Sequence, residues 1–213
     1  MFKLPDLAGR AAIVTGASRG IGRAIAARLA GEGCRLVVCA RGADALDDAA
    51  KELAALTDVA AVALDVTAPE APERLVAAAL DRFGRIDVLV GNAGGNRRKP
   101  LEETTDEDWD VLFDLNVKAH VRCSRAVIPH LRAAGGGAIV FIASIFGREA
   151  GGPGLGLYNT TKSALISAAK ILSLELAPDG IRVNAVAPGS IRFPGGSWDR
   201  RVQADPEVMA RFV

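Results

Sequence analysis

The sequence predicts an α/β protein built on a parallel β-sheet, and three observations lead to that prediction. Six short apolar runs rich in valine and isoleucine alternate with longer alanine- and leucine-rich stretches of helical period. Each run is almost continuously apolar, which is typical of strands that are covered on both faces. The regular succession of strand and helix implies parallel strands with right-handed crossovers. Because no linker or internal repeat interrupts the 213 residues, we expect a single domain over residues 1–213.

The elements follow one another along the whole chain until residue 190. The predicted strands are 11–15, 35–40, 59–64, 86–91, 137–143 and 181–187. The predicted helices are 20–31, 43–56, 69–83, 105–133 and 157–177. Residues 190–213 break the rhythm, since they are polar and include two adjacent glycines and Pro194. We expect a mobile substrate loop or lid there, with a helical turn or two from Pro206, and a disordered tail is the alternative.

Composition excludes several classes of function. The chain has 26 Lys and Arg residues against 25 Asp and Glu residues, so its net charge of +1 gives no electrostatic case for nucleic acid or an anionic membrane. No apolar run reaches transmembrane length, and the first ten residues lack a signal-peptide core. An odd count of three cysteines at unsuitable spacing predicts reduced, half-buried thiols in a cytoplasmic protein, and no metal site. We interpret His120 and His130 as helix-face residues.

The first strand leads directly into a glycine-rich turn, "TGASRGIG", and then into an alanine-rich helix. Glycines at these positions let the backbone approach a pyrophosphate, while the helix start directs free N–H groups toward it. A helix-capping turn with no ligand is the alternative. The cofactor-binding residues predicted in this turn are Gly16, Ser18, Arg19, Gly20, Ile21 and Gly22.

The second strand ends in "VVCARG", where a dinucleotide fold usually has an acidic residue for the ribose hydroxyls. Here the residue is Arg41, and a guanidinium can pair with a 2′-phosphate that a carboxylate would repel. Arg19 offers a second cation on the same side. The pair predicts NADP(H) as the cofactor in preference to NAD(H), unless both arginines are merely solvated.

Candidate adenosine-binding residues follow the third and fourth strands. Asp65 could accept from the adenine amino group, or it could simply cap a turn, and Val66 lies beside it. Asn92, Ala93 and Gly94 follow the fourth strand. We expect these three residues to lie beside the adenosine ribose and the pyrophosphate, with Gly94 allowing close approach.

The reacting groups are expected after the later strands, because ligands bind at the carboxyl ends of such sheets. Ser144 follows the fifth strand, and Tyr158 and Lys162 share one face of the next helix. An adjacent ammonium, together with the oxidised nicotinamide, favours the phenolate, so Tyr158 could act as general acid and base. Ser144 could hold the carbonyl oxygen of the substrate. Lys162 could also hold the hydroxyls of the nicotinamide ribose.

Asn116 lies inside an amphipathic helix, where asparagine is a poor helix former. We expect it to bind a water molecule that links Lys162 to solvent. A structural irregularity of the helix is the alternative.

Taken together, these motifs resemble those of the classical short-chain dehydrogenase/reductase family. The matching residues span nearly the whole chain in the expected order: "TGASRGIG" (15–22), "NAG" (92–94), Asn116, Ser144, "YNTTK" (158–162) and "VNAVAPG" (183–189). The resemblance implies a Rossmann-type doubly wound sheet with strand order 3-2-1-4-5-6. It also implies a catalytic tetrad of Asn116, Ser144, Tyr158 and Lys162, with Pro188 and Gly189 contacting the nicotinamide end. Within the family the chain is similar to 3-oxoacyl-acyl-carrier-protein reductases.

One departure from the family concerns the end of the chain. Relatives usually continue through a further helix and a seventh strand, so the chain is expected to lack that strand and to carry a truncated lid. The resemblance implies a homo-oligomer, either dimer or tetramer, if that C-terminal region is present.

The substrate is expected to be a small carbonyl or alcohol compound. Arg97, Arg98 and Lys99 could attract a carboxylate or phosphate on it, or they could form a solvated loop. Glycines 151, 152, 154 and 156 suggest a pliable rim before Tyr158. Ile191, Phe193 and Trp198 could line a lid that closes over the substrate.

The predicted function is NADP(H)-dependent hydride transfer between the nicotinamide and a ketone or secondary alcohol. The alternatives are a cofactor-binding sensor or interaction protein without turnover, and an NAD(H)-dependent alcohol dehydrogenase.

Overall fold

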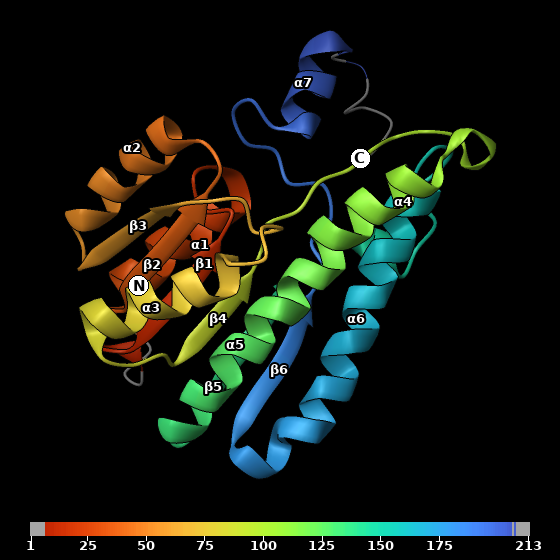
Figure 1. The fold of residues 1–213 in the computed structure, drawn as a ribbon. Coiled ribbons are helices and arrows are strands. Elements are labelled where there is room, and N and C mark those ends of the chain that lie inside the picture. Colours follow the sequence, from red (N-terminus) through yellow and green to blue (C-terminus); the bar gives the residue numbers. More distant parts are fainter. Residues whose placement is uncertain (1–6, 206, 208–213) are drawn as a thin grey trace.

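A computed structural model describes residues 7–205 and residue 207. Its six strands form one parallel sheet in the order β3-β2-β1-β4-β5-β6, as predicted (Figure 1). The strands are β1 (Ala11–Thr15), β2 (Arg35–Ala40), β3 (Val59–Ala63), β4 (Val88–Gly91), β5 (Gly137–Ile142) and β6 (Ile181–Val186). The longer helices are α1 (Gly20–Gly31), α2 (Ala43–Ala54), α3 (Ala71–Phe83), α4 (Asp106–Phe113), α5 (Ala119–Ala133), α6 (Gly156–Leu176) and α7 (Ser197–Ala204).

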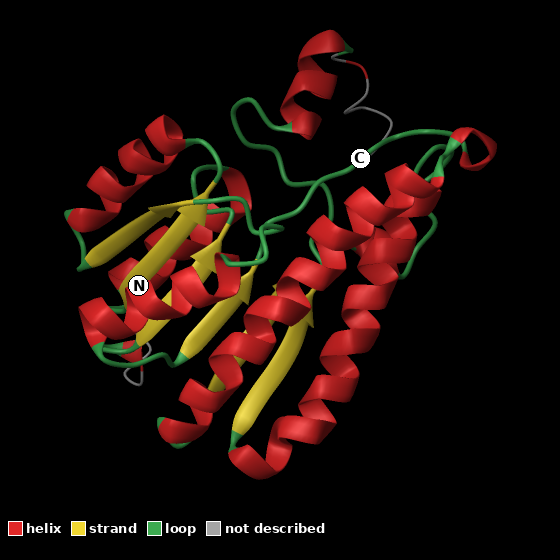
Figure 2. Cartoon of the chain, viewed as in Figure 1, coloured by secondary structure: helices red, strands yellow, loops and turns green. Residues whose placement is uncertain are grey.

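Helices lie on both faces of the sheet and bury two separate apolar clusters. On one face, α1 and α2 pack over β1 and β2, and Ala26, Leu46 and Val38 belong to that cluster. On the other face, α3, α5 and α6 contribute Leu75, Val127 and many more side chains to the larger cluster. Figure 2 shows these three helices in front of the sheet. The strong apolar runs of β1 and β2 are explained by cover on both faces.

The prediction that every strand is covered on both faces is wrong for β3 and β6. No residue of β3 is fully buried, and Ala61 and Ala63 are exposed. Alternate residues of β6 are buried and exposed: Ile181 and Val183 are buried, whereas Arg182 and Asn184 are exposed. The buried residues face α6 and the larger cluster. Among the described residues no helix covers the opposite face of β6, so its side chains meet solvent there.

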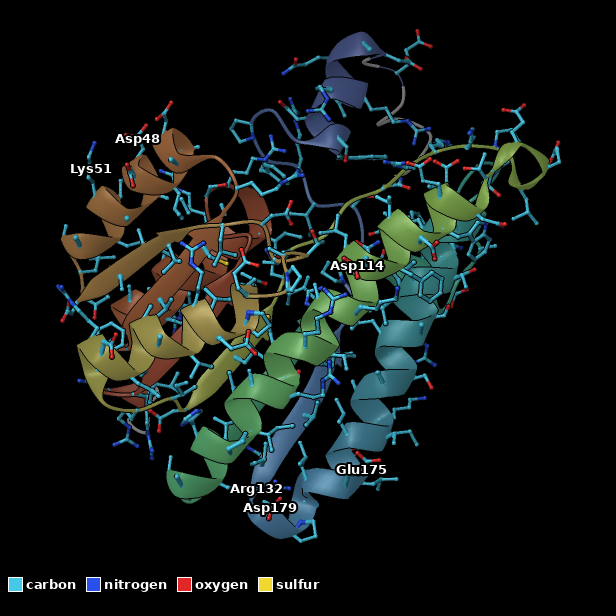
Figure 3. The ribbon with its side chains drawn as sticks, in the orientation of Figure 1. Asp48, Lys51, Asp114, Arg132, Glu175 and Asp179 are labelled. Atoms are coloured by element: carbon cyan, nitrogen blue, oxygen red, sulfur yellow. The ribbon has the colours of Figure 1, made fainter. Side chains whose placement is uncertain are left out.

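The ends of α5 and α6 opposite the glycine turn are joined by an ion pair. Arg132 near the end of α5 donates to Asp179 at 2.7 Å, and Asp179 lies in the short turn between α6 and β6. Figure 3 labels both residues where the two helices meet. Glycine with a positive φ at Gly180, +68°, then starts β6.

Two further predictions need correction. The helix expected over 105–133 is interrupted by a π-helical turn over Asp114–Lys118. The segment after residue 190, expected as a loop or a disordered tail, contains the two-turn helix α7. The helical turn expected from Pro206 lies outside the described residues. Within the described chain, no helix is both long and apolar enough to span a membrane.

Candidate active site and dinucleotide site

The parallel sheet brings the predicted site residues to one edge, because each lies at or beyond the carboxyl end of its strand or on the helix that follows. The glycine turn follows β1, Arg41 follows β2, Asp65 and Val66 follow β3, and Asn92 to Gly94 follow β4. Ser144 follows β5, and Pro188 and Gly189 follow β6. Tyr158 and Lys162 lie in the first turns of α6.

The glycine turn requires its glycines for two physical reasons. Gly16 and Gly20 have φ values of +67° and +59°, a region that L side chains rarely adopt. A Cβ on Gly22 would lie 2.3 Å from the carbonyl oxygen of Gly16 and 2.4 Å from Nδ2 of Asn92. Any larger residue would therefore push α1 away from the turn. The N-cap residue of α1, Arg19, makes no side-chain capping bond, so the helix start is left for another acceptor.

A hydrogen-bonded lock between β1 and β4 holds this turn, and Thr15 is its centre. The Thr15 hydroxyl accepts from the N–H groups of Asn92 at 2.9 Å and Ala93 at 3.0 Å, and it donates to the carbonyl of Val90. The Asn92 amide donates to the carbonyls of Thr15 and Gly16. Sequence reasoning did not single out Thr15, although a polar residue that ends a fully apolar strand is a signal.

The side-chain amide of Asn92 is therefore used in bonds to the backbone of the glycine turn. The expected contact of residues 92–94 with the adenosine ribose remains a prediction, and backbone groups of this segment would have to make it.

Arg41 and Asp65 lie near each other beyond β2 and β3. Their closest side-chain atoms, Nη1 and Oδ2, are 3.9 Å apart, and the Arg41 side chain is 76% exposed. Asp65 Oδ1 accepts from the N–H and the hydroxyl of Thr67, at 2.9 and 2.8 Å. The hydrogen bonds with Thr67 and the charge of Arg41 outweigh burial and hold the pKa of Asp65 below its usual value. Asp65 therefore caps this turn through Oδ1, and its expected contact with the adenine amino group remains a prediction. The long, exposed pair with Asp65 leaves Arg41 available to an anion.

Tyr158 is half-buried beside Ser144, at the end of β5. Burial raises the pKa of the Tyr158 phenol above its ordinary value, and a hydrogen bond with Ser144 opposes that shift. Ser144 is 7% exposed and also accepts from the N–H of Phe146 at 3.2 Å. The serine hydroxyl is thereby fixed next to the phenol, as required of a pair that holds one carbonyl oxygen.

Lys162 lies over the ring of Tyr158. Its Nζ is 5.8 Å from the centre of the Tyr158 ring and donates to the carbonyl of Ile142 at 2.9 Å. Burial lowers the pKa of Lys162 to about 8, so at neutral pH most of it is still protonated. In the free protein the pKa of Tyr158 is raised by burial, so this ammonium alone does not acidify the phenol. The expected acidification in the complex with the oxidised nicotinamide remains a prediction. Acidification needs a further positive charge.

Asn116 is fully buried in the π-helical turn and has few bonds left to make. Its Oδ1 accepts from the N–H of Gly95 at 2.9 Å, while Nδ2 donates to the carbonyl of Gly95 and to Thr161, both at 3.0 Å. Thr161 in turn donates to the carbonyl of Tyr158 at 2.8 Å. Both amide hydrogens are used, so a water molecule bound here would have to contact Oδ1 or the backbone of Asn116, and the water relay remains a prediction.

Thr161, another residue that sequence reasoning missed, links Asn116 to the backbone of the tyrosine. It lies between Tyr158 and Lys162 in the "YNTTK" stretch, which was its only signal.

Two other sequence interpretations change. The three cysteines are free, and all are fully buried rather than half-buried. His120 is a core residue, 2% exposed, with its ring 5.8 Å from that of Phe141. Burial, and then the charge of Lys162, lower the pKa of His120 to about 3, so the imidazole is neutral. A Cβ on Gly91 would lie 2.6 Å from its Nδ1, which explains why glycine ends β4.

One carboxylate, that of Asp108, pairs with two of the three basic residues in loop 97–99. Asp108 bonds both Arg97, at 2.7 Å, and Lys99, at 3.0 Å, and these two bonds lower the pKa of Asp108. Arg98 is exposed and lies against Gly154: a Cβ there would be 3.0 Å from Cγ of Arg98. Nε of Arg98 would lie 3.6 Å from the same Cβ, so the guanidinium lies near the glycine rim, four residues before Tyr158.

The segment after β6 lies over the glycine turn. Pro188 is half-buried and accepts from the N–H of Ile145 at 3.0 Å, whereas Gly189 is exposed with open space around it. The ring of Phe193 lies against Gly20 at the start of α1. We did not expect this contact from the sequence, which placed Phe193 over the substrate.

The residues at this edge fit a dinucleotide. The glycine cradle would be filled by any Cβ at Gly22, and the start of α1 has no side-chain cap. An exposed cation follows β2, at the position where an adenosine ribose phosphate would lie. No group of three or more histidine, cysteine or acidic residues in the described part of the chain could hold a metal ion.

Comparison with known proteins gives a consistent result. Residues 10–200 match the family model described as short chain dehydrogenase. The chain is 42% identical over 205 residues to dehydrogenase/reductase SDR family member 4 of Oryctolagus cuniculus, covering 93% of this chain and 78% of the relative.

Two solved structures are also similar. One is L-sorbose reductase from Gluconobacter frateurii, complexed with NADPH and L-sorbose, with a TM-score of 0.86 at 38% identity. The match covers 93% of this chain and 81% of the reductase chain. The other is a 7α-hydroxysteroid dehydrogenase complexed with NADH and 7-oxo glycochenodeoxycholic acid, with a TM-score of 0.83 at 32% identity. The match covers 89% of this chain and 74% of the dehydrogenase chain.

Proposed function

The chain belongs to the short-chain dehydrogenase family of oxidoreductases, which act on CH–OH groups, and from that membership we propose that it reduces a ketone with NADP(H), with Tyr158 as the general acid. One observation carries the proposal: the sheet holds the Tyr158–Ser144 pair and buried Lys162 at the edge that bears the glycine turn. Each of these features alone is common. Their convergence at one edge provides a place for a dinucleotide and a proton donor beside its far end.

Each residue has a separate role in this proposal. A dinucleotide held by the glycine turn would supply hydride to the carbonyl carbon of the substrate. Tyr158 donates its proton to the carbonyl oxygen as negative charge develops there, and the reverse reaction returns the proton to the phenolate. Ser144 donates a hydrogen bond to the same oxygen and fixes the carbonyl. Lys162 keeps a positive charge over the ring, which stabilises the phenolate once the proton has left.

Asn116 has a positional role. Through Thr161 it holds the backbone of Tyr158, and through Gly95 it holds the loop after β4. The proposal is tested by following NADPH consumption with a panel of ketones, diketones, sugars and acyl thioesters. Dinucleotide binding with no turnover of any of them would favour the sensor alternative.

The preference for NADP(H) rests on Arg41. The solved neighbours hold NADPH in one case and NADH in the other, so likeness of fold alone does not decide between the cofactors. Arg41 is exposed and only loosely paired, and its guanidinium suits a 2′-phosphate. Pro188 and Gly189 are proposed at the nicotinamide end, and Val66 and the 92–94 segment at the adenosine end.

The first expected result follows from that charge. Arg41→Ala should raise the Kd for NADPH about tenfold, because a charge-assisted hydrogen bond is lost, and should leave the Kd for NADH unchanged. Isothermal titration of both cofactors measures this. Arg74→Ala, an exposed arginine on α3, is the matched control and should change neither Kd. Tighter binding of NADH than NADPH by the unaltered chain would contradict the assignment.

The substrate class can be narrowed by Arg98. Since Asp108 already pairs with Arg97 and Lys99, Arg98 is the cation of this loop that is left to meet a substrate at the rim. We propose that the ketone carries a carboxylate or another anionic group. One solved neighbour binds an acid of this kind, 7-oxo glycochenodeoxycholic acid.

A second expected result tests this substrate class. Arg98→Ala should raise KM for a keto acid about tenfold, the effect of losing one charge-assisted contact, with no change for its neutral methyl ester. Steady-state kinetics with the acid and ester pair measure the difference, and Arg125→Ala on α5 is the control. An equal effect on acid and ester would show that Arg98 acts on the fold of the loop instead.

We further propose that the enzyme is a cytoplasmic homo-oligomer. Ile171 and Leu174 of α6 support an association surface, because they are 54% and 72% exposed.

A further inference from the structure

The ring of Phe193 covers the start of α1. A Cβ on Gly20, the first residue of α1, would lie 2.6 Å from Cζ of Phe193 and within 2.9 Å of both Cε atoms. The same three ring atoms would lie 2.9–3.0 Å from a Cβ on Gly196, the N-cap residue of α7. The tip of the ring is therefore held between the glycine turn and the start of α7.

An apolar ring is an unsuitable neighbour for this part of α1. The first N–H groups of a helix have no partner within the helix, and they favour an anion. Here Arg19 provides no side-chain cap, and the first turn contains no acidic residue. Phe193 has no acceptor to offer, so the ring occupies the place of a ligand without satisfying the groups beneath it.

The segment that carries Phe193 is tied together internally. Asp199, 6% exposed, accepts from Nε of Arg192 at 2.8 Å, from the N–H of Gly195 at 3.0 Å and from Nε2 of Gln203 at 2.9 Å. These bonds all lie within residues 192–203, so this part can move as one unit. Gly189, exposed and without close neighbours, provides a hinge. In Figure 1, α7 lies beyond the carboxyl ends of the strands and apart from the other helices.

We propose that residues 190–204 are a gate on the dinucleotide site and that Phe193 is its latch. In the closed state shown here, the ring lies over Gly20, where the diphosphate of the dinucleotide has to approach the backbone. The dinucleotide binds after the gate turns away at Gly189. This inference rests on the proposed function, since it requires the glycine turn to be the diphosphate site.

The gate has two measurable consequences. Molecules in the closed state cannot bind the dinucleotide. The observed Kd therefore equals the Kd of the open state divided by the fraction of molecules that are open. Binding at high dinucleotide concentration is limited by the opening step, so its rate reaches a plateau. A variant that cannot latch should lose both effects.

The test uses Trp198 of α7 as the reporter. The chain has two tryptophans, and Trp109→Phe leaves Trp198 alone. Two proteins are compared, Trp109→Phe alone and Trp109→Phe combined with Phe193→Ala. For each, the Kd for NADP⁺ and the rate of binding by stopped-flow fluorescence are measured. We expect Phe193→Ala to lower Kd about tenfold and to abolish the plateau in the rate. Leu56→Ala, which removes an exposed apolar side chain outside the gate, is the control and should leave Kd and plateau unchanged.

Adenosine 2′-monophosphate distinguishes a gate from a general change in the site. Its one phosphate is on the 2′ position, and it lacks the diphosphate that has to approach Gly20. Its Kd should be the same with and without Phe193. Weaker NADP⁺ binding by Phe193→Ala, or an unchanged Kd and plateau, would overturn the gate while leaving the proposed function intact. If neither protein binds NADP⁺ or NADPH, the proposed function itself fails, and the gate fails with it.

Discussion

Replacing Tyr158 by phenylalanine is expected to lower kcat for ketone reduction by about a thousandfold, the range for loss of a positioned general acid. The ring itself would remain, packed on Lys162, and only the proton donor would be lost. The Kd for NADPH should therefore stay within about twofold of that of the unaltered enzyme, because binding energy that is unrelated to the proton transfer is untouched. Single-turnover measurements of NADPH oxidation, together with equilibrium titration, separate the two quantities.

Ser144→Ala is the companion variant for this result. It removes the second hydrogen bond to the carbonyl oxygen but keeps the proton donor, so its loss of kcat should be smaller than that of Tyr158→Phe. A Tyr158→Phe enzyme that keeps a tenth or more of its rate would show that another group supplies the proton.

The largest expected effect on stability comes from Asn116. Asn116→Ala should lower the free energy of unfolding by about 3 kcal/mol, since it leaves the N–H and carbonyl of Gly95 and the hydroxyl of Thr161 without their partner. Because Thr161 holds the backbone of Tyr158, kcat should fall as well. Urea unfolding, followed by circular dichroism, measures the stability change.

Asn96→Ala is the control for this variant, because Asn96 is exposed in the loop that follows Gly95. It should leave the free energy of unfolding within about 0.5 kcal/mol of the original value. An Asn116→Ala protein as stable as this control would mean that the three bonds contribute nothing, and the positional role would have to be abandoned.

The sequence predicted the sheet well, and the reason is physical. Strands buried on both faces, such as β1 and β2, need an unbroken apolar run. Apolar runs marked all six strands of the sheet to within two residues at each end. The glycine turn was equally readable, because its positive φ values and close backbone contacts admit no other residue at Gly16 and Gly22. β6 misled the prediction because one covered face was enough to keep its buried positions apolar.

What the sequence did not reveal depends on contacts between distant residues. A lone asparagine signalled an irregularity at Asn116, but its bonds to Gly95 and Thr161 follow only from the tertiary structure. The contact of Phe193 with Gly20 joins positions 173 residues apart, which no local pattern specifies. The burial of Tyr158 also follows only from the tertiary structure, and in the free protein it raises the pKa of the phenol.

The proposed chemistry depends on a phenol that changes its acidity when the site is filled. Tyr158 is the single tyrosine of the chain, so the near-ultraviolet absorbance of phenolate reports on this residue alone. In the free protein the pKa should lie above the ordinary phenol value, because burial disfavours the charged form. With NADP⁺ bound, the positive nicotinamide and Lys162 together should lower that pKa, because both charges favour the phenolate.

The decisive measurement is therefore a pH titration of this absorbance without and with saturating NADP⁺, with Tyr158→Phe as the blank. The account predicts that phenolate forms at clearly lower pH in the complex, and that the rate of alcohol oxidation rises with pH over the same range. A phenol that titrates at the same high pH in both states would contradict the account, because Tyr158 would then remain protonated where the enzyme has to accept a proton.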